Sequence, residues 1–132
     1  MNERIKNQIQ EIIDSMNCQD EPPYAWTNDL MIMSVTRAFV DNLYYYAIKL
    51  CYEIFQRYGY SANEFIKRIE EERTRQEKLH PYNEKTNYSL IALEELCEIA
   101  KAYNDLDENG MIDELIQFVA VIVRIMEIED MW

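Results

Sequence analysis

The chain has few residues that interrupt helices. Its 132 residues include only 2 Gly and 3 Pro, which leaves few places for tight turns. A chain of this length can bury a single hydrophobic core. The scarcity of turn residues therefore predicts one all-α domain over residues 1–132, an antiparallel helical bundle of about five helices.

The sequence also lacks the signatures of several common functions. It holds one His, no glycine-rich phosphate loop and no Ser/His/Asp arrangement, which sets aside P-loop kinases and serine hydrolases. Acidic residues outnumber basic ones by 25 to 13, and the formal net charge is −12. A nucleic-acid duplex is therefore not an expected partner, because binding its backbone needs a basic surface. A nucleotide stays compatible, since a metal ion brings its own positive charge.

Membrane insertion and disulfide bonding are not expected either. The 3 Cys show no CxxC spacing, and the first residues do not resemble a signal peptide, so a cytoplasmic location is the simplest expectation. Charged side chains interrupt the most apolar stretch, residues 28–58, too often for a membrane span. These charges fall at Arg37, Asp41, Lys49, Glu53 and Arg57.

Hydrophobic spacing predicts helices over about 2–16, 28–58, 62–79, 89–103 and 111–129. A loop at 18–26, which contains Pro22 and Pro23, separates the first two. Ser61 and Glu64 form a capping box that opens the third helix, and Pro81 ends it. We expect the aromatic side chains of the second helix to lie in the core or in an oligomer contact rather than to stack on bases.

Acidic residues crowd one turn of the fourth predicted helix, where Glu94, Glu95 and Glu98 lie close together. The fifth helix would project Glu114 and Gln117, and the short linker makes the two helices antiparallel. Oxygen ligands could then converge on a hard cation such as Mg²⁺. Two structural readings stay open: acidic helix faces are often simply solvated, and the helix dipole favours an acid at position 114.

Three ordered segments strengthen the metal reading: ERTRQEKLHP at 72–81, LIALEELCEIAKA at 90–102 and DELIQFVAV at 113–121. Their order resembles the MazG-like, all-α nucleoside triphosphate pyrophosphohydrolases, whose acidic helix reads EExxE and whose next helix supplies ExxD. The resemblance covers about residues 66–130. It implies a MazG-like core over about 61–132, preceded by an N-terminal helical extension over 1–60.

In that family, acidic side chains hold Mg²⁺, and an activated water cleaves a nucleoside triphosphate between its α and β phosphates. The products are the nucleoside monophosphate and pyrophosphate. For this chain the resemblance implies Glu95, Glu98, Glu114 and Gln117 as metal ligands, with Mn²⁺ as a possible substitute for Mg²⁺. It also implies catalytic roles for Glu95, Glu98 and Glu94, the last as a ligand or as the base that orients water.

Basic residues near these motifs are candidates for phosphate contacts. We expect Arg75, Lys78 and Lys101 to serve in this way. The structural alternative for the helix over 62–79 is a solvated face of salt bridges, in which Arg75 pairs with Glu71 four residues before it.

Two positions depart from the family pattern. Gln117 stands where the family has Asp, and Cys97 stands where many members have Gly. A glutamine offers a carbonyl oxygen but no charge, so the site should hold its ions less tightly. A catalytically degenerate, MazG-like helical interaction protein is therefore an alternative, as is an enzyme for a related diphosphate such as a nucleotide sugar or alarmone. Because such all-α enzymes bury helices between subunits, we also expect a homo-oligomer, either a dimer or a tetramer.

Overall fold

Every regular element of the computed structural model, which describes residues 1–17, 28–41 and 44–130, is an α-helix. The predicted all-α class is therefore confirmed. None of the helices in these ranges is long and apolar enough to cross a membrane. The helices are α1 (Glu3–Asn17), α2 (Asn28–Val40), α3 (Tyr44–Arg57), α4 (Ala62–Leu79), α5 (Tyr88–Asn104) and α6 (Glu108–Asp130).

The prediction of one long helix over 28–58 is wrong. This stretch forms two helices, α2 and α3, which pack against each other, so the described ranges hold six helices rather than five. At the end of α2, the Asp41 N–H donates to the Arg37 carbonyl at 3.0 Å. No Gly or Pro marks this point, and apolar side chains continue on both sides of it, so the sequence pattern hides the break. The loop predicted at 18–26 lies outside the described residues.

Local capping fixes the helices that position the candidate site. Helix α4 spans 62–79, as predicted, and the Ser61 hydroxyl accepts the Glu64 N–H at 3.2 Å. Helix α6 begins at Glu108, slightly earlier than expected, and the Asp107 carboxylate accepts the Gly110 N–H at 2.9 Å. A Cβ atom at position 110 would collide with that carboxylate, so any larger residue there would force the Asp107 side chain to move.

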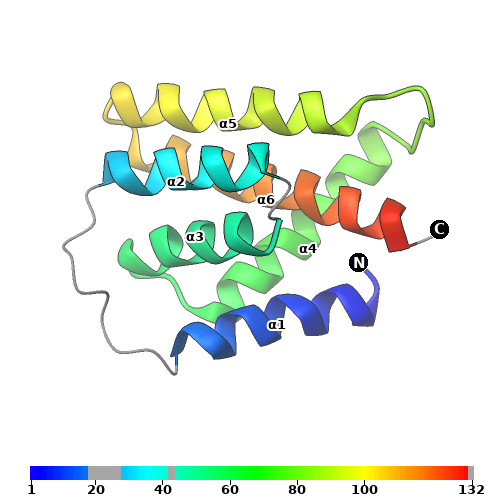
Figure 1. Ribbon diagram of the computed structural model, residues 1–132, viewed down its shortest axis with the longest axis horizontal. Coiled ribbons are helices and arrows are strands. Elements are labelled where there is room, and N and C mark those ends of the chain that lie inside the picture. The colour runs from blue at the N-terminus through cyan, green and yellow to red at the C-terminus, as the bar shows by residue number, and fades with distance from the viewer. Residues whose placement is uncertain (18–27, 42–43, 131–132) are drawn as a thin grey trace.

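Helix α6 is the central element of the bundle. It packs against α5, α4, α3 and α1, while α2 packs on α3. Figure 1 shows α5 and α1 at opposite edges of the view, with α4 running obliquely between them. Because α6 packs against helices on several sides, it cannot rotate about its axis. The core therefore fixes which of its polar side chains face α4 and α5.

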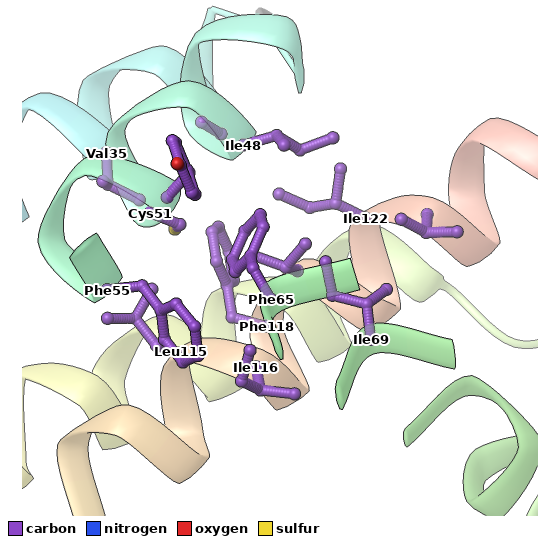
Figure 2. Close-up of a cluster of buried hydrophobic side chains, with 14 of the residues drawn as sticks. Val35, Ile48, Cys51, Phe55, Phe65, Ile69, Leu115, Ile116, Phe118 and Ile122 are labelled. Carbon is purple, nitrogen blue, oxygen red and sulfur yellow. The ribbon is translucent and has the colours of Figure 1, made fainter. Parts of the chain in front are cut away.

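The core joins aromatic and aliphatic side chains from all six helices. Phe55, Phe65 and Phe118 are fully buried at its centre, as Figure 2 shows, and the rings of Phe55 and Phe65 lie 5.2 Å apart. Buried residues of α1 and α3 belong to the same cluster as those of α4, α5 and α6. Helices α1 and α3, from the N-terminal part of the chain, therefore share one core with the helices that carry the acidic motifs.

Candidate carboxylate site

Three carboxyl groups act on that of Glu95 where α4 and α5 pack on α6. Glu95 of α5 is hydrogen-bonded to Glu114 of α6, and the charges of Glu72 on α4 and Glu98 on α5 act on the same Glu95 carboxyl group. We call these four residues the carboxylate site. The structure thus brings together the three acidic residues predicted as metal ligands and adds Glu72.

The carboxylate site changes the acidity of Glu95. The pKa of Glu95 is raised to about 7. The largest cause is partial burial, the next is the hydrogen bond and charge of Glu114, and the charges of Glu72 and Glu98 contribute least. All of these effects disfavour a second negative charge in a region partly removed from water. Glu95 is therefore partly protonated near neutral pH, and the protonated form can donate a hydrogen bond to Glu114.

Sequence reasoning missed Glu72, whose side chain is only 12% exposed. Its carboxylate accepts the Arg75 Nε–H at 2.8 Å and a weaker hydrogen bond from the Gln76 amide at 3.3 Å. Gln76 is itself buried and donates to the backbone carbonyl of Gln117 on α6 at 3.4 Å. This contact ties α4 to α6 one turn beyond Glu72, whose charge acts on Glu95. The i, i+3 and i, i+4 spacing of Glu72, Arg75 and Gln76 along one helix could have indicated that Glu72 is held by these two side chains.

Arg75 is the predicted phosphate-binding cation that lies beside the carboxylates. It pairs with Glu72 rather than with Glu71, and the Glu72 hydrogen bond, together with the charges of Glu72 and Glu95, raises its pKa. Lys78 lies elsewhere, in the lining of a separate cavity. Lys101 is exposed in the last turn of α5, one turn beyond Glu98.

The remaining predicted residues lie around the edge of the carboxylate site. Glu94 is exposed on α5 next to Glu95, and Cys97 is an exposed free thiol. Gln117 is half-buried on α6, one turn after Glu114, and its backbone carbonyl already accepts the Gln76 amide. Glu94 and Gln117 therefore flank the four interacting carboxyl groups.

The carboxylate oxygens of this site suit a hard divalent cation, although their arrangement does not form a complete set of metal ligands. Across the ranges that the structure describes, no three Asp, Glu, Cys or His side chains form a group that could hold a metal ion. Carboxylate oxygens from three helices are nevertheless the ligands that such cations use. The mutual repulsion that raises the pKa of Glu95 is also the kind of field that a bound cation relieves.

Comparison with known proteins adds no assignment: no protein-family model, no curated protein and no solved structure matches this chain.

Proposed function

We propose that this chain is a Mg²⁺-dependent nucleoside triphosphate pyrophosphohydrolase of the MazG-like kind, which releases a nucleoside monophosphate and pyrophosphate. The main support is the set of interacting carboxyl groups of Glu72, Glu95, Glu98 and Glu114, with Arg75 beside them. Three separate helices supply these groups. Glu95, Glu98 and Glu114 belong to the two acidic motifs that resemble the family, and Glu72 opens the segment that precedes them.

Each residue has a proposed task. Glu95, Glu98 and Glu114 would hold Mg²⁺ or Mn²⁺, with the side-chain oxygen of Gln117 as a neutral ligand. When bound, the metal polarises phosphate oxygens and lowers the pKa of a bound water. The exposed Glu94 carboxylate would orient that water by accepting its hydrogen bond.

Arg75 and Glu72 would prepare the site for the polyphosphate. The Arg75 side chain is 52% exposed while its Nε and Nη2 groups hold Glu72, so it combines a fixed position with access from solvent. A guanidinium group at such a position can meet the phosphate oxygens of an arriving nucleotide. Glu72, held by Arg75 and Gln76, adds a negative charge that offsets the neutral Gln117.

The decisive experiment measures pyrophosphate release from a panel of canonical and modified nucleoside triphosphates with Mg²⁺ or Mn²⁺. The panel includes a nucleotide sugar and an alarmone, which test the related diphosphate substrates. The Glu98→Gln variant removes one proposed ligand charge at nearly constant size. We expect it to lower turnover by at least about 100-fold, more than loss of an outer-shell partner of a metal usually costs.

Glu71→Gln is the matched control, because Glu71 is an exposed acid on α4 next to Glu72. It should keep full activity, and both variants should retain the helical circular dichroism of the parent protein. Equal turnover of the parent and Glu98→Gln proteins would remove Glu98 from the site. No pyrophosphate release by the parent protein from any compound of the panel would reject the proposed enzymatic function.

A helical interaction protein that has lost its chemistry is the second candidate. It is favoured by the neutral Gln117 and by the lack, in the described part of the chain, of a side-chain group already arranged around a metal. This candidate predicts that neither Mg²⁺ nor Mn²⁺ binds. Stoichiometric uptake of either ion in a calorimetric titration would count against it.

A further inference from the structure

A second charged region lies on the face of α4 opposite Glu72. It is a cavity of about 600 Å³ between α4, α6 and the loop that joins α4 to α5. At about 100° per residue, the α4 side chains that line it are centred roughly on the other side of the helix from the carboxylate site. Its volume is in the range of small-molecule sites. The lining residues that matter here are Arg73, Glu77, Lys78, Tyr82, Arg124 and Glu127.

Two arginine side chains are fixed beneath this cavity. Arg73 is 7% exposed and Arg124 is 6% exposed. Arg73 donates through Nη2 to Glu77 at 3.2 Å and to Glu127 at 3.0 Å. Arg124 donates through Nη2 to the His80 carbonyl at 2.7 Å, while its guanidinium carbon lies 4.7 Å from the centre of the Tyr88 ring. Both cations are therefore held in place by contacts that use only part of their hydrogen-bonding capacity.

The remaining polar atoms of the two arginines lack partners. The Nε and Nη1 groups of Arg73 and the Nε group of Arg124 are buried and have no acceptor among the described residues. The Oε1 atom of Glu127 is likewise buried and has no donor there. Unpaired buried donors on a charged group are costly. These atoms have almost no exposed surface, so a ligand in the cavity would reach them once the side chains that cover them rotate aside. A ligand that brings several acceptor oxygens and a hydroxyl group would then satisfy both kinds of atom.

The local charge selects the sign of that ligand. Arg73, Lys78 and Arg124 place three positive charges around the cavity, and Glu77 and Glu127 place two negative charges there. Both carboxylates pair with Arg73, and Glu77 also lies 3.6 Å from Arg124, so the net excess is one positive charge. This excess of positive charge occurs in a chain of formal net charge −12. A phosphate group offers oxygens in several directions, which suits donors that come from two different helices better than the two coplanar oxygens of a carboxylate do.

We infer that this cavity binds a small phosphate monoester that also carries a hydroxyl group. Its phosphate oxygens would accept from the guanidinium groups of Arg73 and Arg124, with Lys78 adding charge at the exposed side. A ligand hydroxyl would donate to Glu127. The site uses no metal and none of the four carboxylates, so it stands or falls independently of the proposed enzyme.

Adenosine 5′-monophosphate is a suitable probe, because it carries a phosphate monoester and sugar hydroxyl groups. We would titrate it into the full chain in the presence of EDTA, which removes metal-dependent binding at the carboxylate site, and follow backbone amide shifts by NMR. Saturable shifts of residues around Arg73 and Arg124 are expected, with competition by inorganic phosphate. No shifts up to about 10 mM ligand, or equally tight binding of adenosine, would overturn the inference.

Matched charge reversals test the location. Lys78→Glu should weaken binding at least about tenfold, because it replaces an attraction by a repulsion at the cavity. Lys67→Glu makes the same change at an exposed position about three turns earlier on α4, and it should leave binding within about twofold. Equal weakening of ligand binding by the two variants would show a general effect of net charge and would overturn the assignment of the site to this cavity.

A direct change at the arginines completes the test. Arg124→Gln should abolish measurable binding, whereas Glu98→Gln should leave it unchanged. Because Arg124 is buried, this variant is first checked by circular dichroism, and the exposed Lys78→Glu protein decides the question if Arg124→Gln does not fold. Undiminished binding to a folded Arg124→Gln protein would overturn the inference.

Discussion

Glu95 of α5 and Glu114 of α6 are hydrogen-bonded to each other through their carboxyl groups, across the interface of the two helices. Two carboxyl groups can form this bond only while one of them keeps a proton. Burial and the surrounding carboxylates raise the pKa of Glu95 to about 7, so the bond is present at mildly acidic pH and is lost as the pH rises through neutrality. The contact between the two helices is therefore sensitive to pH.

Replacement of Glu95 by Gln should remove much of this sensitivity. Folding raises the pKa of Glu95 from its usual 4.5 to about 7, so the folded protein binds this proton more tightly than the unfolded chain does. The resulting stabilisation is complete below the unfolded value and disappears as the pH rises through the folded value. We expect Glu95→Gln to be more stable than the parent protein at about pH 8 but not at about pH 5, measured by urea unfolding.

Glu94→Gln is the control for this experiment, because it removes the same charge from an exposed neighbouring position. It should keep the parent protein's loss of stability between the two pH values. A parent protein whose unfolding free energy does not fall over this interval would contradict the shared proton.

The sequence predicts the fold best where local chemistry marks the helix ends. Helix α4 matches its expected range because Ser61 caps its start and Pro81 follows its end. The separation of α2 from α3 has no such mark, because α2 ends near Asp41 without Gly or Pro nearby, and the two helices pack on each other and share the core. Periodicity alone cannot supply that information.

The same distinction applies to the candidate site. Glu95, Glu98 and Glu114 were accessible to sequence reasoning because two adjacent helices with a short linker must lie side by side. Glu72 was not, because its position depends on how α4 crosses α6, which the buried Gln76 and its bond to the Gln117 carbonyl help to fix. Contacts between distant helices were beyond the sequence pattern.

Metal uptake at the carboxylate site should release a proton. A carboxyl group must be ionised to bind Mg²⁺ or Mn²⁺, and Glu95 is partly protonated near neutral pH. We expect calorimetric titrations in two buffers of different ionisation enthalpy to show proton release at about pH 6.5 and almost none at about pH 8.5. Glu84→Gln, which changes an exposed acid of the α4–α5 loop, should behave as the parent protein does. Metal uptake without proton release at the lower pH would exclude Glu95 as a ligand.

A single substitution at Leu106 should stabilise the folded protein. It follows the C-cap residue of α5 with a φ of 57°. Its N–H bonds back to the Tyr103 carbonyl, and that of Asp107 bonds back to the Ala102 carbonyl. This motif favours glycine, because a Cβ atom is strained in the left-handed region. The Leu106 side chain is 87% exposed, so little packing would be lost. We expect Leu106→Gly to raise the free energy of unfolding by about 0.5–1 kcal/mol in urea titrations.

Leu106→Ala separates the two possible causes of that gain. Alanine removes the exposed apolar side chain but keeps the Cβ atom, so the backbone strain should remain and the stability should change little. Equal stabilisation by Ala and Gly would show that the exposed side chain, rather than the left-handed backbone, is unfavourable.

The predicted homo-oligomer can be tested at α2 and α3, which replace the single helix whose aromatic side chains were expected in the core or in an oligomer contact. Large apolar side chains are exposed there, including Met33 and Val40 at 66% and Tyr46 at 49%. Burial of such side chains between subunits would stabilise a dimer or tetramer. Light scattering at micromolar concentration should give a mass above that of one chain, and Val40→Lys should lower it. Leu90→Lys, at an exposed leucine of α5, should not. A monomeric parent protein would contradict the predicted oligomer. Equal dissociation by both variants would show that the contact does not lie specifically at α2 and α3.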